Sequence, residues 1–177
     1  MRDTSHKRGY ARVTRRVTDS RRPEEAIRKC QFMRECPTIA VVVVNYRTPD
    51  LALQCLAALR AERVALPSLT AVLVDGGSDD ASAETLRARL YHPDFRDWVT
   101  FLPLAINGGF GWANNQAILM LARQSGPPDY LYLLNPDTQV QSGAVERLMD
   151  ELKANPACGA AGSQLLSSNG QVAKIFW

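Results

Sequence analysis

The sequence has few of the side chains that bind zinc or form disulfide frameworks. Its 177 residues include four cysteines and two histidines, none at metal-ligand spacing: Cys30, Cys36, Cys55, Cys158, His6 and His92. We therefore expect no zinc site. With no cysteine framework and no signal peptide, the chain is predicted to be cytoplasmic, with reduced thiols.

Long apolar runs are also absent. The longest hydrophobic stretches, such as Ile39–Val44, are far shorter than the ~20 residues that a membrane-spanning helix requires. The chain is 46% hydrophobic, 22% charged and 7% aromatic, which is the composition of a soluble globular protein. A chain of this length is predicted to form one domain with a sizeable core.

Charge is distributed unevenly. Residues 1–37 hold 11 Lys and Arg against 5 Asp and Glu, a net charge of +6, which leaves a net charge of −3 for residues 38–177. A basic tail can contact nucleic acid or anionic lipid, but this one has no interleaved aromatic residues and no apolar segment. We therefore expect residues 1–37 to be a disordered, solvated tail that binds no nucleic acid, and residues 38–177 to form the domain.

From residue 38 onward, short apolar runs alternate with stretches of helical periodicity. The predicted strands are Ile39–Asn45, Leu69–Asp75, Trp98–Leu102 and Tyr130–Asn135. The predicted helices begin at Thr48–Asp50, with Leu51, Cys55 and Leu59 on one face, and then cover 81–90 after an Asp80 N-cap, 112–124, and 142–154 with Val145, Leu148, Met149 and Leu152 facing inward. This alternation predicts an α/β fold, an open, twisted, mainly parallel sheet with helices on both faces.

Ligands of such sheets bind at the carboxyl ends of the strands, so the residues that end each strand are candidates for a site. Polar residues and glycines stand at these positions: Asn45-Tyr46, Asp75-Gly76-Gly77-Ser78, Asn107-Gly108-Gly109 and Asn135-Pro136-Asp137. We expect all four segments to converge on one edge of the sheet.

Asp75 ends a strand and is followed by two glycines, so its carboxylate can project into the crevice above a tight turn. There it can accept the N3–H of a uracil or thymine ring. The alternative is a carboxylate that only closes the turn, although Asp80 is better placed to cap the next helix. Ser78 and Ser82 are predicted to be turn and first-turn residues rather than ligands.

Three glycines follow Asn107 and open a predicted helix, which allows the backbone to approach a ribose or diphosphate. The segment does not fit G-x-G-x-x-G and follows the third strand, which argues against a dinucleotide-dependent oxidoreductase. Asp137 follows an apolar strand and a rigid Asn-Pro step, and it can bind Mg²⁺ or Mn²⁺ together with substrate phosphate oxygens. A simple Asn-Pro-Asp turn is the alternative.

Together, these segments resemble four motifs of the family 2 glycosyltransferases of GT-A fold, especially the bacterial branch that includes rhamnosyltransferases. Val41–Tyr46 is similar to the first-strand motif, Val74–Asp80 to VDN-x-S-x-D, Asn107–Asn115 to NxGFxxxNN, and Leu134–Thr138 to LNPDT, this branch's form of the DxD metal motif. Gly76 and Arg47 depart from the family pattern, in which an asparagine is usual at each position.

The resemblance implies specific roles for residues at the strand ends. Asp75 would bind the base, and Asn45 and Tyr46 would belong to the donor site beside it. The donor pocket would be shaped by Asn107, Gly109 and Asn115, and Asn135 and Asp137 would lie at the metal and the diphosphate.

The resemblance also implies a reaction. A sugar would pass from a UDP- or dTDP-linked donor to a saccharide or lipid-linked acceptor, with inversion, in cell-envelope polysaccharide synthesis. The enzyme would be cytoplasmic and would associate peripherally with the inner face of the cytoplasmic membrane.

An inverting transferase needs a general base, and in this family the base is a carboxylate well downstream of the metal motif. No Asp or Glu follows Glu151, and the sequence ends with the apolar run Val172–Trp177. The acidic residues before that point, Glu146, Asp150 and Glu151, are predicted to form the solvated face of a helix. We therefore expect a donor-binding portion truncated at its C-terminus, with a non-catalytic nucleotide-binding fragment or remnant as the alternative.

Overall fold

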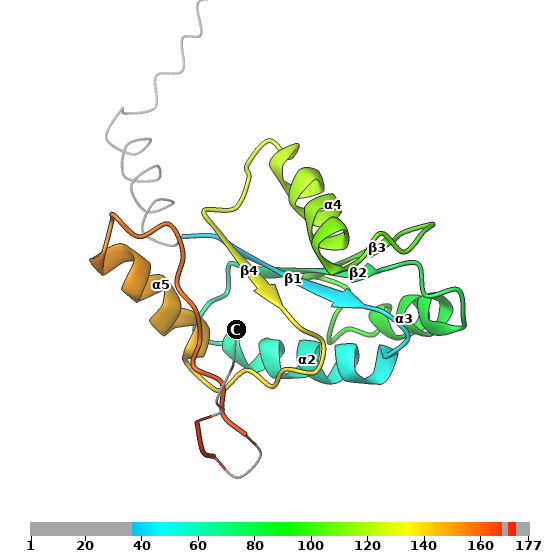
Figure 1. Ribbon diagram of the computed structural model, residues 1–177, viewed down its shortest axis with the longest axis horizontal. Coiled ribbons are helices and arrows are strands. Elements are labelled where there is room, and N and C mark those ends of the chain that lie inside the picture. The colour runs from blue at the N-terminus through cyan, green and yellow to red at the C-terminus, as the bar shows by residue number, and fades with distance from the viewer. Residues whose placement is uncertain (1–36, 168–169, 173–177) are drawn as a thin grey trace, which may run out of the picture. The chain divides into compact units, whose positions relative to one another are not determined.

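The computed structural model of this chain describes residues 37–167 and 170–172. The expectations for residues 1–36 of the basic segment and for the apolar residues 173–177 fall outside this described part. Within it, strands and helices alternate along the chain as the sequence predicts (Figure 1).

The sheet is parallel throughout and has the strand order β3-β2-β1-β4. Its strands are β1 (Ile39–Asn45), β2 (Leu69–Asp75), β3 (Val99–Pro103) and β4 (Tyr130–Leu134). Every residue of β1 is buried, as its run of valines predicts for a central strand with both faces covered. The edge strands β3 and β4 are shorter and partly exposed.

Four helices connect and cover these strands: α2 (Pro49–Glu62), α3 (Ser82–Leu90), α4 (Phe110–Ala122) and α5 (Ala144–Ala154). Figure 1 shows α4 above the sheet, with α2 and α3 below it. Among the described residues, no helix is both long enough and apolar enough to cross a membrane.

The two faces of the sheet bury separate apolar clusters. On one face, Val41 and Val43 pack with leucines of α2 and α3 and with Val145 of α5. On the other face, Val42 packs with Ala117 and its neighbours on α4. The prediction of helices on both faces is therefore confirmed, and the alternating side chains of β1 contribute to both clusters.

The predicted elements are confirmed with small shifts at their ends. The third strand begins at Val99 because Trp98 still belongs to the preceding turn, where its indole Nε1 donates to the carbonyl of Asp94 at 2.7 Å. The helix predicted from residue 112 begins at Phe110, directly after Gly109. Ala81 is the N-cap residue of α3, but Asp80 supplies the capping oxygen, which accepts the N–H of Ser82 at 2.8 Å.

One predicted helix face is partly wrong. Leu51 was expected to share the buried face of α2 with Cys55 and Leu59, yet it is 39% exposed, whereas those two residues are buried. The 3.6-residue period of the helix places Leu51 at the margin of a stripe centred on Ala52 and Leu59, in the first turn, where little covers it.

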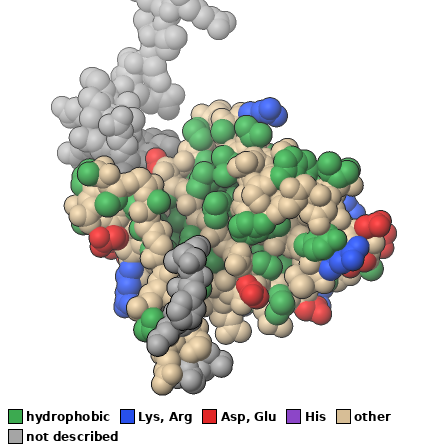
Figure 2. Space-filling view, viewed as in Figure 1, with side chains coloured by type: hydrophobic (Ala, Val, Ile, Leu, Met, Phe, Trp, Pro, Cys, Tyr) green, Lys and Arg blue, Asp and Glu red, His purple; other side chains and the backbone are tan. Residues whose placement is uncertain are grey.

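The cover over β4 is incomplete. Leu131 and Leu133 pair in register with Ala40 and Val42, so they point to the face that α4 covers, but both are exposed. Figure 2 shows hydrophobic side chains gathered across the middle of the visible face, over β4 and α4. The sheet is thus covered on both faces at β1 and left open on one face at β4.

We expect Leu56→Ala to lower the free energy of unfolding by about 2–5 kcal/mol, because Leu56 is fully buried in the apolar cluster that contains Val41 and Val43, and its truncation leaves a cavity. Leu51→Ala is the matched control and should cost less than about 1 kcal/mol. Urea denaturation followed by circular dichroism measures both. Equal losses would contradict the assignment of the buried face of α2.

Candidate functional site

The carboxyl ends of the strands meet at one edge of the sheet. Asn45 pairs in register with Asp75, and Asp75 with Pro103, while Leu134 of β4 lies beside Val43 of β1. Each loop that follows a strand therefore starts from the same edge, as the sequence predicts.

A buried polar cluster joins the ends of β1 and β2. Asn45 Nδ2 donates to Asp75 Oδ1 at 2.7 Å, and Ser78 Oγ donates to the same oxygen at 2.6 Å. The backbone N–H of Ser78 donates to Asp75 Oδ2 at 3.2 Å. Because a buried carboxylate is costly unless it is hydrogen-bonded, these three donors are what allow Asp75 to be only 2% exposed.

Within this cluster, Asp75 and Asn45 each stabilise a turn. Asp75 closes the turn at residues 75–78, the alternative that its sequence position left open. Asn45 is fully buried, and its Oδ1 accepts the backbone N–H of Thr48 at 3.1 Å, which shapes the turn into α2. The contact of Asp75 with a base stays a prediction.

Tyr46 and Arg47 lie on this framework and are exposed. Ser78 fixes Arg47 twice, since its Oγ accepts the Arg47 backbone N–H at 3.0 Å and its carbonyl accepts Arg47 Nε at 2.9 Å. The guanidinium carbon lies 5.1 Å from the centroid of the Tyr46 ring, within cation–π distance. The Tyr46 ring and the Arg47 guanidinium are thus held side by side at the carboxyl edge of the sheet.

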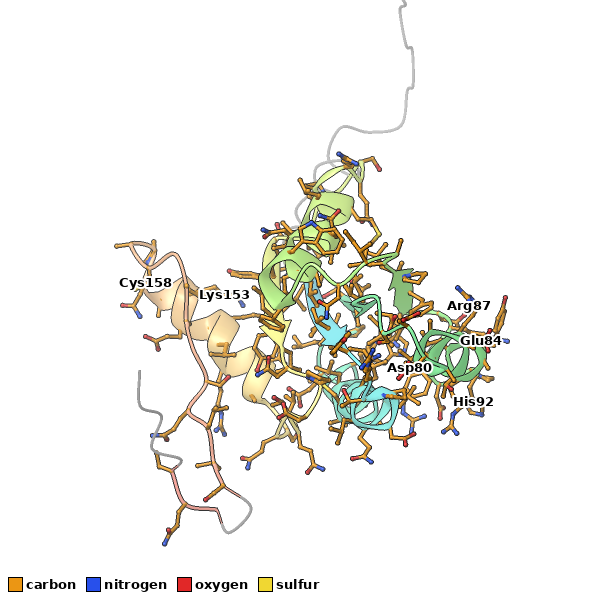
Figure 3. The ribbon with its side chains drawn as sticks, turned by 45° about the vertical axis from the view of Figure 1, so that its right-hand side comes forward. Asp80, Glu84, Arg87, His92, Lys153 and Cys158 are labelled. Atoms are coloured by element: carbon orange, nitrogen blue, oxygen red, sulfur yellow. The ribbon has the colours of Figure 1, made fainter. Side chains whose placement is uncertain are left out.

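An acidic residue stands close to this pair. Asp80, labelled in Figure 3, lies where the chain enters α3, with Glu84 and Arg87 following on that helix. Hydrogen bonds from Ser82, together with the charge of Arg47, hold the pKa of the Asp80 carboxyl below its ordinary value. Asp80 therefore acts as an ionised cap, and Ser82 is a first-turn residue as predicted.

The loop after β2 contacts the loop after β3. Gly77 has a φ of 71°, and a Cβ built on it would lie 2.5 Å from the carbonyl carbon of Ile106. In the second loop, Asn107 Oδ1 accepts the N–H of Gly109 at 2.9 Å, and Gly109 has a φ of 86°. Glycine at 77 and 109 therefore permits the approach and the turn that place Asn107 at the edge.

Asn114 is a residue that the sequence argument did not select. It is 3% exposed, its Nδ2 donates to the carbonyl of Phe110 at 2.9 Å, and its Oδ1 has no hydrogen-bond partner among the described residues. Helical spacing is the sequence signal that could have selected it, because Asn114 lies on the same helix face as Ala113 and Ala117, and this face of α4 is buried. The predicted Asn115, one residue later, is exposed.

The segment after β4 carries the exposed residues Asn135 and Asp137. The N–H of Thr138 donates to the carbonyl of Asn135 at 3.2 Å, which closes a tight turn around Pro136 and Asp137. The thiol of Cys55 on α2 lies 3.8 Å from the same Asn135 carbonyl. Burial, with the charge of Asp137 adding to it, raises the pKa of the Cys55 thiol to about 12.

The donor set fits a hard cation held by few protein ligands. The described residues contain no group of three or more His, Cys, Asp and Glu side chains that could hold a metal ion. Asp75 is enclosed and the Cys55 thiol is protonated at neutral pH, which leaves Asp137 as the exposed predicted carboxylate. Mg²⁺ commonly binds to one or two carboxylates together with phosphate and water oxygens. One exposed carboxylate, that of Asp137, is compatible with this kind of coordination.

The acidic residues of α5 do not contribute to the candidate site at the carboxyl edge of the sheet. Glu146, Asp150 and Glu151 are exposed on α5, and Lys153 Nζ lies 3.2 Å from Asp150 Oδ1. The prediction that these residues form a solvated helix face is confirmed.

Comparison with known proteins identifies related sequences. A family model described as glycosyl transferase family 2 matches residues 40–174. The N-acetylglucosaminyl-diphospho-decaprenol L-rhamnosyltransferase of two Mycobacterium tuberculosis strains is 29% identical over 110 residues, which are 59% of this chain and 34% of the relative.

Solved structures show a similar fold. A mannosyltransferase from Pyrobaculum calidifontis, in complex with GDP-Man and Mn²⁺, has a TM-score of 0.55 at 19% identity and covers 66% of this chain and 32% of its own. S. aureus TarS 1-349 in complex with UDP-GlcNAc has a TM-score of 0.54 at 16% identity, over 67% of this chain and 32% of its own. This chain therefore spans about a third of the length of the relatives that it matches.

We expect Asp75→Asn to lower the free energy of unfolding by about 1–3 kcal/mol, because an amide N–H₂ would face donors of Asn45 or Ser78. Asp79→Asn is the control, since Asp79 is exposed and asparagine tolerates its φ of 50°. Thermal and urea denaturation compare the two variants. A loss no greater than that of the control would contradict the buried cluster.

Gly77→Ala should destabilise the fold by about 1–3 kcal/mol, because alanine is strained at this φ and its Cβ would meet the Ile106 backbone. Gly111→Ala in α4, where nothing lies within 4 Å, should instead stabilise by about 0.5–1 kcal/mol. Differential scanning calorimetry gives both values. A neutral Gly77→Ala would show that the two loops do not touch.

Proposed function

This chain belongs to glycosyl transferase family 2, and we propose that it binds the nucleoside diphosphate of an activated sugar at the carboxyl edge of its sheet. The observation that carries the proposal is that loops starting from this one edge bear three exposed groups: the Tyr46–Arg47 pair, the Asn107–Gly109 turn and the turn that bears Asp137. An aromatic ring, a helix N-terminus and a carboxylate suit a base, a ribose diphosphate and a bound cation.

At the base end of the site, we assign Tyr46 and Arg47 to the nucleoside. Asp75 Oδ1 already accepts two hydrogen bonds, while Oδ2 accepts one, so one acceptor position is left on Oδ2. The N3–H of a uracil or thymine ring is the donor proposed for that position, which favours a UDP- or dTDP-linked sugar. Asn45 orients the carboxylate for this contact.

At the diphosphate end, we assign Asn135 and Asp137. Asp137 would hold Mg²⁺ or Mn²⁺, and the ion would neutralise the charge of a departing diphosphate. We assign Asn107, Gly109 and Asn115 to the donor pocket as well. The presence of Mn²⁺ with GDP-Man in the Pyrobaculum calidifontis mannosyltransferase supports this assignment.

The proposal extends to a reaction. We assign inverting transfer of the sugar to a saccharide or lipid-linked acceptor, in cell-envelope polysaccharide synthesis. The Mycobacterium tuberculosis relative is named for a diphospho-decaprenol substrate, which supports a lipid-linked acceptor and peripheral association at the cytoplasmic face of the membrane. Because this chain spans about a third of its relatives' length, donor binding is the step assigned to the residues described.

The direct test is isothermal titration of the chain with UDP, dTDP and GDP, with and without Mn²⁺. We expect Mn²⁺ to tighten the binding of UDP or dTDP by about tenfold or more, equivalent to ~1.4 kcal/mol or more. Asp137→Asn should remove that gain, because the proposed ion loses its protein carboxylate. Asp97→Asn, which makes the same charge change before β3 at the opposite edge, should keep it.

Two outcomes separate the proposals. The assigned site would be overturned if no nucleotide binds, or if nucleotide affinity changes neither on addition of Mn²⁺ nor in Asp137→Asn. Binding without transfer to a lipid-linked acceptor would favour the alternative, a non-catalytic nucleotide-binding remnant.

A further inference from the structure

Glu62 is a buried carboxylate for which the proposed donor site has no use. It is the last residue of α2 and is 4% exposed. Its Oε1 accepts the N–H of Gly143 at 2.9 Å, and its Oε2 accepts the N–H of Val145 at 3.2 Å. Both partners lie at the start of α5, more than eighty residues away in the sequence.

These contacts supply a cap that α5 lacks. The N-cap residue of α5 is Gly143, with a φ of 75° and no side chain to accept a first-turn N–H. Glu62 accepts the N–H of the N-cap residue Gly143 and the N–H of Val145 in the first turn, and its negative charge lies at the positive end of the helix dipole. The start of α5 is therefore fixed to the end of α2.

A second contact from α2 lies at residue 135, at the far end of the segment 135–143 that precedes α5. Cys55 lies seven residues before Glu62, two helical turns away on the same buried face, and its thiol lies 3.8 Å from the carbonyl of Asn135. Between the two contacts, Val140 packs against the apolar cluster that includes α2. Residues 135–143 thus contact α2 or its apolar cluster at both ends and in the middle, most strongly at Glu62, with Asp137 inside the segment.

We propose that Glu62 is a positioning residue for Asp137: through the start of α5, it fixes residues 135–143 on α2 and so sets where the Asp137 carboxylate lies at the edge. The proposal rests on the proposed function for its consequence, cation-dependent nucleotide binding. It rests on the described contacts alone for the claim that Glu62 holds the segment.

Glu62→Gln is the informative substitution. Glutamine keeps the size of the side chain but has one acceptor oxygen, so its N–H₂ group must face either the Gly143 or the Val145 N–H. Glu84→Gln is the matched control, because Glu84 is exposed on α3 (Figure 3) and undergoes the same chemical change.

Hydrogen–deuterium exchange tests the structural part without any ligand. In Glu62→Gln, we expect exchange of the amides of residues 135–145 to rise by about tenfold or more, with β1 within about twofold of the parent chain. The Glu84→Gln control should leave both regions unchanged. Unchanged exchange at 135–145 in Glu62→Gln would overturn the proposal.

Titration with UDP tests the positioning part. The Mn²⁺-dependent gain in affinity should fall by about fivefold or more in Glu62→Gln, while affinity in EDTA stays within about twofold, because only the Asp137 end is displaced. A full Mn²⁺ gain despite faster exchange would show that Glu62 stabilises α5 without positioning Asp137.

One further variant and the behaviour of the parent chain keep the outcomes separate. If Glu62→Gln does not fold, Glu62→Asp keeps the charge but is too short to reach both N–H groups, and it should show the same two effects. If the parent chain binds no nucleotide, the proposed function fails, and Asp137 loses the role for which it is positioned. The exchange measurement still decides whether Glu62 holds the segment.

Discussion

The hydrogen bonds of the Asp75 carboxylate are the interaction on which the edge of the sheet depends. They connect the last residue of β1 to the last residue of β2 and to Ser78 in the following turn. Ser78 then fixes Arg47, and Asn45 shapes the entry into α2. The buried Asp75 carboxylate thus determines, through Ser78, where the exposed Arg47 side chain lies, although Asp75 does not contact Arg47 directly.

The helix that follows β1, α2, also contacts the segment that follows β4. The start of α2 is hydrogen-bonded to Asn45, and its last residue, Glu62, is hydrogen-bonded to Gly143. The helix therefore connects the loops after β1 and β2 to the segment after β4. Two regions separated by about ninety residues in sequence are therefore held on one rigid element, which is the condition for a site that must bind a base at one end and a diphosphate at the other.

Much of the fold could be predicted from local pattern, because buried strands and amphipathic helices leave periodic signals. The valine run gave β1 within its observed bounds, and polar strand ends indicated the correct edge. Side-chain orientation could not be predicted in the same way. The enclosure of Asp75 and the capping by Glu62 depend on partners 30 and more than 80 residues distant, and the exposure of Leu51 depends on what covers the first turn of α2.

We propose above all that the carboxyl edge of the sheet binds a nucleoside diphosphate. A ¹H–¹⁵N correlation spectrum of the labelled chain, titrated with UDP in the presence of Mg²⁺, tests it residue by residue. We predict shifts of the backbone amides of Gly77, Gly109 and Asp137, and no shift of those of Asp97 and Gln124 at the opposite edge. Shifts confined to the opposite edge, or none at saturating UDP, would contradict it.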